Sequence, residues 1–159
     1  MDTVALRPAL PADDEFCFHL HKAAMGSVVT AIWGWNEQDQ RAHHARVFDP
    51  SRWQIVTVDG ADAGILVVEH RDVEVYLGRI ELHPRYQGLG IGARLVRTVI
   101  ETAARLEQDL VLDVLAANVR AHAFYLREGF QDVTRHGDEN HKIRMRYALQ
   151  SAHRAGTDG

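Results

Sequence analysis

A glycine-rich turn with the sequence GLGIGA, residues 88–93, most constrains how this chain can fold. Three glycines at alternate positions remove Cβ atoms from one side of the turn, so successive backbone N–H groups can face one anion. A strand-like run precedes the turn and a helix-like run follows it, and the N-terminus of a helix favours negative charge. The pattern therefore predicts a phosphate-binding turn, and we expect the function to be centred beside it.

The composition is typical of a globular domain. The chain has 159 residues, of which 46% are hydrophobic and 25% are charged, which suits one hydrophobic core and is short for two ordinary ones. No apolar run approaches the length of a membrane-spanning helix, and the first four residues do not begin a signal peptide. We therefore expect a single domain in the cytoplasm, a monomer or homodimer without a membrane partner.

Charge and spacing argue against three other kinds of site. A net charge of -4 does not suit a protein that tracks nucleic-acid phosphates. The chain has ten histidines, but His19 and His21 are two apart and His43 and His44 are adjacent, so they point in different directions on a helix and no metal is expected. Cys17 lies at helical spacing among apolar residues and is interpreted as a small core residue, not a nucleophile.

Periodicity and turn residues predict several antiparallel strands followed by one parallel strand–helix–strand unit. In chain order we predict a strand at 4–9, helices at 16–33 and 36–48, strands at 53–58, 63–69 and 73–83, a helix at 91–106, a strand at 110–115, a helix at 118–128 and strands at 130–134 and 142–149. The first helix is expected to weaken near 28–30. Asp59-Gly60 is a tight-turn dipeptide, and Ala61-Asp62 are expected to continue the loop.

These elements predict an α/β (α+β) fold, with a mixed, mostly antiparallel, twisted sheet of about seven strands and helices on both faces. We assign residues 3–149 to one domain and residues 150–159 to a flexible C-terminal tail.

Two interpretations of the glycine turn compete. Residues 88–93 fit the relaxed dinucleotide pattern G-x-G-x-x-A, and Asp113 lies at a suitable distance downstream to contact a ribose. In a dinucleotide fold, however, this pattern follows the first strand of a repeated series, whereas here an antiparallel hairpin comes first. A small NAD(P)-dependent oxidoreductase is therefore the weaker alternative.

The second interpretation combines the turn with a later helix. Gln87-x-x-Gly90-x-Gly92 is followed by Asn118-x-x-Ala-x-x-Phe-Tyr125, and that helix ends in Gly129-Phe130. At these residues the chain resembles the GNAT superfamily of acyl-CoA-dependent N-acetyltransferases. The order of elements resembles the family over about residues 3–149, and the motifs lie within about 80–130.

The resemblance implies that acetyl-CoA binds beside the strand that ends at Leu82 and His83. Its pantetheine arm would meet the backbone of Leu82, and its pyrophosphate the N–H groups of the turn. The residues assigned to the cofactor are Leu82, His83, Gln87, Gly88, Leu89, Gly90, Ile91, Gly92, Ala93, Asn118 and Tyr125. Gln87 stands where the family more often has Arg and could instead cap the helix, and Asn118 could serve as a helix N-cap at the same time.

Two side chains are candidates for catalysis. The resemblance implies that the hydroxyl of Tyr125 protonates the leaving thiolate as a general acid; the alternative is an aromatic packing residue. Glu81 is the candidate general base, although strand alternation places it opposite Leu82 unless the strand has a bulge, as the resemblance implies. Alternatives are a solvated Glu81, an ion pair with Arg79 or Arg94, and a base that acts through water. Two other candidate bases are Glu74, which has the right parity but lies far along the strand, and His83, which could instead be an exposed residue at the strand end.

The acceptor site is expected near Trp33 and Trp35, where aromatic faces and nearby carboxylates suit a cationic amine. The alternative is that both tryptophans close the core. The predicted function is transfer of an acetyl group from acetyl-CoA to a primary amine of a small molecule or peptide, by direct attack in a ternary complex. A non-catalytic acyl-CoA sensor remains the main alternative.

Overall fold

The computed structural model describes residues 3–149. The predicted tail at 150–159 lies outside the described residues. The described residues form two compact units: unit 1 contains 3–67 together with 79–92, and unit 2 contains 68–78 together with 93–149. Each unit is described by itself below.

The observed elements follow the predicted order. The strands are β1 (Val4–Pro8), β2 (Trp53–Val58), β3 (Ala61–His70), β4 (Glu74–Leu82), β5 (Asp109–Leu115), β6 (Gln131–His136) and β7 (Lys142–Tyr147). The helices are α1 (Asp14–Trp33), α2 (Glu37–Val47), α3 (Ile91–Arg105) and α4 (Val119–Arg127). The strand order is β1-β2-β3-β4-β5-β7-β6. Strand β2 pairs antiparallel with β1 and β3, and β7 pairs antiparallel with β5 and β6, whereas β4 and β5 pair in parallel. The predicted mixed, mostly antiparallel sheet is therefore confirmed.

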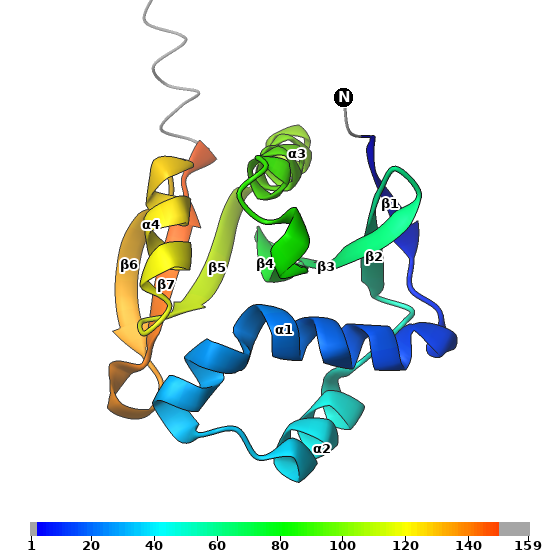
Figure 1. Ribbon diagram of the computed structural model, residues 1–159. Coiled ribbons are helices and arrows are strands. Elements are labelled where there is room, and N and C mark those ends of the chain that lie inside the picture. Colours follow the sequence, from blue (N-terminus) through cyan, green and yellow to red (C-terminus); the bar gives the residue numbers. More distant parts are fainter. Residues whose placement is uncertain (1–2, 150–159) are drawn as a thin grey trace, which may run out of the picture. The chain divides into compact units, whose positions relative to one another are not determined.

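In unit 1, apolar side chains of α1 and of the end of α2 pack against those of β2 and β3. Figure 1 shows the course of both helices and of these strands. The core cluster contains Ala9, Cys17, Leu20, Trp53, Ile55, Ile65 and Val67, with Phe16, Val47 and Phe48 packed against it. Cys17 is fully buried there, and burial raises the pKa of its thiol to about 12. The interpretation of Cys17 as a core residue is therefore confirmed.

Helix α1 does not weaken where the sequence predicts it. The β-branched run 28–30 lowers helix propensity, yet the helix continues unbroken to Trp33. Val29 is buried, and the Thr30 hydroxyl donates a hydrogen bond of 2.6 Å to the carbonyl of Gly26. Tertiary packing and this local bond offset the unfavourable propensity.

The turn between β2 and β3 is tighter than predicted. Asp59 and Gly60 have φ values of 51° and 84°, and β3 begins directly afterwards at Ala61. Two consecutive residues with positive φ form a turn whose twist matches that of the flanking strands. The predicted tight turn at Asp59-Gly60 is therefore confirmed, whereas the predicted continuation of the loop through residues 61 and 62 is wrong because both belong to β3.

Strands β3 and β4 approach closely at Gly64. A Cβ atom on this residue would overlap the carbonyl oxygen of Glu81 and lie 2.8 Å from Cδ2 of Leu82. Next to this point, the His83 N–H donates to the carbonyl of Ala63 over 2.9 Å. The end of β4, which carries the candidate site residues, is thus held directly against β3.

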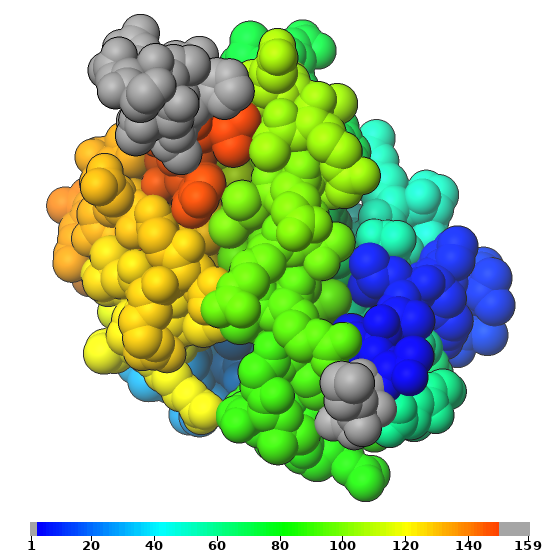
Figure 2. Space-filling view, turned by 90° about the horizontal axis from the view of Figure 1, so that it is seen from above, coloured from blue at the N-terminus to red at the C-terminus, as the bar shows by residue number. Residues whose placement is uncertain are grey.

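In unit 2, α3 buries one side of its surface and α4 lies beside it (Figure 2). Arg97 of α3 and Glu128 after α4 form an ion pair of 3.3 Å. Helix α3 ends at Arg105, one residue before the predicted end, and Leu106 is exposed. The buried residues of this unit come mainly from α3, β5 and β7: Leu95, Val96, Val99, Ala103, Leu110, Val111, Leu112, Val114, Ile143 and Met145.

Candidate active site

Two glycines of the turn have a left-handed backbone conformation. Gly88 and Gly90 have φ values of 75° and 80°, and a Cβ atom on either would meet nothing within 4 Å. Glycine is therefore required here by conformation rather than by space. Gly88, Leu89 and Gly90 are exposed, Ile91 begins α3, and Gly92 and Ala93 lie in the first turn of that helix.

Gln87 acts on the loop before the turn. Its side-chain amide donates a hydrogen bond of 2.9 Å to the carbonyl of Leu82, and its N–H donates to the carbonyl of Pro84. The His83 ring accepts a hydrogen bond from the N–H of Arg85. Both side chains thus fix the path of residues 82–87, an outcome that the sequence analysis missed.

Glu81 is buried and charged. Its Oε2 lies 2.6 Å from Nδ1 of His21 on α1, and its Oε1 lies 3.3 Å from Nη1 of Arg79. Burial alone would raise the pKa of this carboxyl, but the hydrogen bond with His21 and the charge of Arg79 outweigh it, so the pKa is held below its usual value. The alternative of a solvated Glu81 is wrong, and the predicted ion pair with Arg79 is present.

The last two side chains of β4 are both buried. Glu81 and Leu82 are consecutive, yet their exposed fractions are 7% and 9%. In a regular strand, neighbouring side chains point to opposite faces. Both faces of β4 are therefore covered at its end, and neither Glu81 nor Leu82 faces solvent.

The two tryptophans differ in environment. Trp33 is 59% exposed at the end of α1, so it does not close the core. Trp35 is half-buried, its indole N–H donates to Glu37 over 2.7 Å, and Nζ of Lys22 lies 5.7 Å from the centre of its ring. The Trp35 ring also lies 6.5 Å from that of His21. Trp35 therefore lies beside the His21 and Glu81 pair.

Unit 2 supplies the remaining predicted residues. Asn118 is the N-cap of α4, and its side chain accepts a hydrogen bond from the N–H of Ala121 over 3.2 Å. The N-cap interpretation is therefore confirmed. Tyr125 is buried on α4, with its ring centre 5.2 Å from that of Phe124 and 5.6 Å from that of Phe130.

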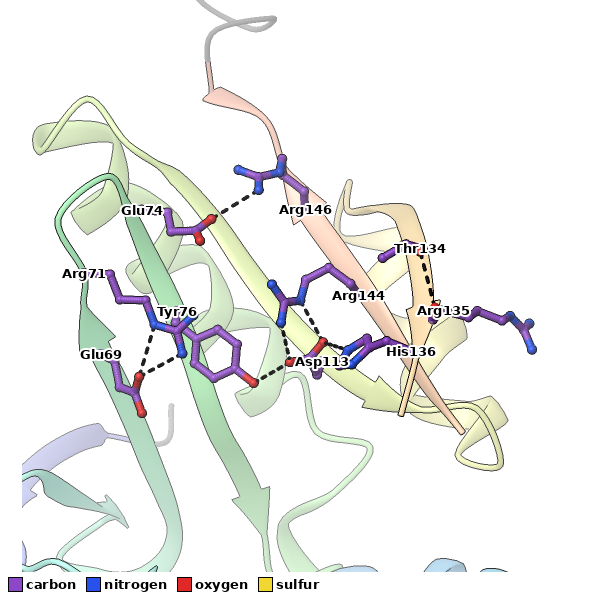
Figure 3. Close-up of polar contacts among 10 residues, drawn as sticks. All are labelled: Glu69, Arg71, Glu74, Tyr76, Asp113, Thr134, Arg135, His136, Arg144 and Arg146. Atoms are coloured by element: carbon purple, nitrogen blue, oxygen red, sulfur yellow. Dashed lines mark hydrogen bonds and ion pairs between the residues drawn. The ribbon is translucent and has the colours of Figure 1, made fainter. Parts of the chain in front are cut away.

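Asp113, the residue that could contact a ribose, belongs to a polar cluster on the sheet of unit 2 (Figure 3). Its carboxylate accepts hydrogen bonds from Tyr76 (2.8 Å) and Arg144 (2.8 and 3.0 Å), and it lies 2.6 Å from Nε2 of His136. Burial alone would raise the pKa of Asp113, but these bonds lower it to about 2. A carboxylate engaged by three side chains does not suit a ribose ligand, which weighs against the dinucleotide alternative.

Replacing Asp113 by Asn should lower the free energy of unfolding by about 2 kcal/mol at pH 7, because the folded-state pKa of about 2 is below the ordinary value of 3.8. This stabilisation is present above pH 4 and is lost as the pH falls through about 2. Urea unfolding at pH 7, 4 and 3 should show that the difference in the free energy of unfolding between the wild type and Asp113→Asn becomes smaller as the pH falls. Asp132→Asn, at an exposed pair with His122, is the control and should have little effect.

Residues 3–149 contain no group of three or more His, Cys, Asp and Glu side chains that could hold a metal ion. Over the same residues, no helix is both long enough and apolar enough to span a membrane.

Comparison with known proteins gives a consistent result. Residues 15–130 match the model of the acetyltransferase (GNAT) family. The fold is similar to that of a PaiA N-acetyltransferase from Thermoplasma acidophilum solved with coenzyme A, at 15% identity and a TM-score of 0.74, covering 91% of this chain and 98% of that one. It is also similar to the ribosomal-protein-S18-alanine N-acetyltransferase of Escherichia coli, at 21% identity and a TM-score of 0.62, covering 92% of each chain. No curated protein sequence is a detectable match.

These matches confirm the fold class that the sequence predicts. Because the identities are below 25%, they establish the fold alone. The roles of individual site residues stay predictions.

Proposed function

The chain belongs to the acetyltransferase (GNAT) family, and from this premise we propose that it transfers an acetyl group from acetyl-CoA to a primary amine of a small molecule or peptide. The observation that carries the proposal is the turn with Gly88 and Gly90 at positive φ, directly before the first residue of α3. The family match spans 15–130 and so includes residues of both units. Because one family match covers parts of both units, it supports the proposal that residues 3–149 form one acetyltransferase domain.

Acetyl-CoA is the proposed acyl donor. The turn offers backbone N–H groups at the N-terminus of a 15-residue helix, an arrangement suited to a pyrophosphate. One structure with this fold was solved with coenzyme A, which supports the same ligand here. The residues proposed to contact it are those of the turn, the backbone of Leu82 and His83, and Asn118 and Tyr125.

Direct attack of the amine on the thioester is the proposed route. Cys17, the one cysteine of the chain, is buried in the core and its thiol pKa is raised to about 12. It does not suit a covalent acyl carrier. In the proposal, Tyr125 protonates the departing thiolate, and Glu81 takes part in removing a proton from the attacking amine.

Trp33 and Trp35 are the proposed contacts of the acceptor amine. An aromatic face attracts a cation, and the ammonium of Lys22 already lies over the Trp35 ring. The proposed location is the cytoplasm, and the proposed partners are acetyl-CoA and an amine alone.

Calorimetry with acetyl-CoA, coenzyme A and NAD, followed by thiol release with a panel of amines, tests this function. The panel contains a polyamine, a free amino acid, an aminoglycoside and peptides with a free lysine or N-terminus. We expect acetyl-CoA binding and turnover of at least one amine. Binding of NAD without coenzyme A would contradict the proposal, and binding of acetyl-CoA without any turnover would support a sensor instead.

Replacing Gly90 by Ala should weaken acetyl-CoA binding about 10-fold, because a side chain at this positive φ costs about 1–2 kcal/mol. Calorimetric titration of both proteins measures the change. Gly60→Ala is a matched control, since Gly60 has a similar φ of 84° and equally open space but lies in the β2–β3 turn. The control should lose stability but keep its affinity for acetyl-CoA.

A further inference from the structure

One buried pair in unit 1 has the geometry of a proton-accepting dyad. His21 on α1 and Glu81 on β4 are 60 residues apart in sequence, yet Nδ1 and Oε2 lie 2.6 Å apart. The carboxylate can only accept, so the neutral imidazole must donate from Nδ1. This bond leaves the lone pair on Nε2.

The imidazole of His21 is more exposed than the carboxylate of Glu81. The His21 side chain is 19% exposed, whereas that of Glu81 is 5% exposed. Among residues 3–149, no side chain or backbone group forms a hydrogen bond with Nε2 of His21. An incoming amine can therefore reach the imidazole more easily than the carboxylate behind it.

The surroundings hold this arrangement in place. Arg79 on β4 pairs with the other carboxylate oxygen, Oε1, which accepts no hydrogen bond from the described residues. His43 and His44 of α2 lie within electrostatic range of the pair, and Lys22 is the next residue of α1. Because Arg79 and the hydrogen bond with His21 stabilise the ionised form, the Glu81 carboxyl has a lowered pKa and is a weak base.

The pair also lies where the proposed reaction needs it. Glu81 directly precedes Leu82, whose backbone is proposed to meet the pantetheine arm, and the Trp35 ring lies 6.5 Å from that of His21. A primary ammonium has a pKa near ~10.4 and must lose a proton before it can attack. An imidazole titrates nearer to neutral pH than a stabilised carboxylate, and so suits this step better.

We propose that Nε2 of His21 takes the proton from the acceptor ammonium and that Glu81 is the positioning residue that orients the imidazole. This inference rests on the proposed acetyltransferase function. One ammonium proton passes to His21 and on to solvent, and the free amine forms the C–N bond. The C–S bond breaks with its electron pair on sulfur. Tyr125 protonates the resulting thiolate, and the second proton of the attacking nitrogen restores the Tyr125 hydroxyl.

His21→Gln tests the assignment. We expect kcat to fall about 100-fold or more, with an unchanged affinity for acetyl-CoA and no acidic limb in the pH profile of kcat. The defect should shrink with acceptors that are already neutral at the assay pH, such as hydrazines, because they need no base. His19→Gln is the matched control, since His19 lies on the same helix in an exposed pair with Glu15, and it should match wild type.

Glu81→Gln should retain more activity than His21→Gln and should move the acidic limb of the profile to lower pH, because loss of the carboxylate makes the imidazolium easier to deprotonate. Equal turnover of His21→Gln and wild type would overturn this inference and leave the proposed function intact. A wild-type protein that acetylates no amine would overturn both. Nitrogen-15 NMR of the wild type gives a test without any variant: protonation on Nε2 instead of Nδ1 in neutral His21 would overturn the inference.

Discussion

Replacing Tyr125 by Phe is expected to lower kcat for acetyl transfer about 100-fold or more, because a thiolate that departs without a proton loses general-acid assistance. The affinity for acetyl-CoA should barely change. Phe keeps the ring that packs against Phe124 and Phe130, so the hydroxyl alone is removed. Steady-state release of free thiol gives kcat, and calorimetry gives the affinity.

Tyr147→Phe provides the control for this prediction. Its ring belongs to the same aromatic cluster, with its centre 5.7 Å from that of Phe130. Loss of its hydroxyl should leave kcat unchanged. If Tyr125→Phe also turns over like the wild type, Tyr125 is a packing residue and another group must protonate the thiolate.

Local patterns were sufficient for the order of elements and for the glycine turn. The place of the turn directly before a helix follows from the glycines and the apolar periodicity after them, and the cap at Asn118 follows from its place before a helix. These features depend on residues within a few positions of one another. They can therefore be predicted without knowledge of the packing.

The pair of His21 and Glu81 could not be predicted in this way. Its members are 60 residues apart in sequence. Strand alternation gives the face on which a side chain lies but not the residues that pack against that face. Only the packing of α1 in unit 1 brings the imidazole to the carboxylate. The hydrogen bond from Gln87 to Leu82 spans just five residues. It was not predicted because the same side chain could equally have capped the helix that follows.

The same packing explains why a remote glycine should affect the site. Gly64 of β3 lies against the backbone of Glu81 and the side chain of Leu82. Any side chain on Gly64 must push the end of β4 away. The carboxylate that orients His21 and the backbone proposed to meet pantetheine would then shift together.

Gly64→Ala is therefore expected to lower the free energy of unfolding by about 3 kcal/mol, the upper part of the range for inserting a methyl group into a packed interior. The added Cβ overlaps a backbone carbonyl oxygen, which cannot rotate away as a side chain can. Urea unfolding at pH 7 measures the loss, and calorimetry should show weaker acetyl-CoA binding in the same variant.

Gly26→Ala is the matched control because it adds the same methyl group inside α1, where the Cβ would meet only Cγ of Lys22 at 3.9 Å. This variant should be as stable as the wild type or slightly more so, since Ala favours a helix by about 0.5–1 kcal/mol over Gly. If Gly64→Ala unfolds at the same urea concentration as the wild type, β3 and β4 do not approach as closely as described. If it is destabilised but binds acetyl-CoA normally, the end of β4 does not hold the donor, and the proposed pantetheine contact at Leu82 is wrong.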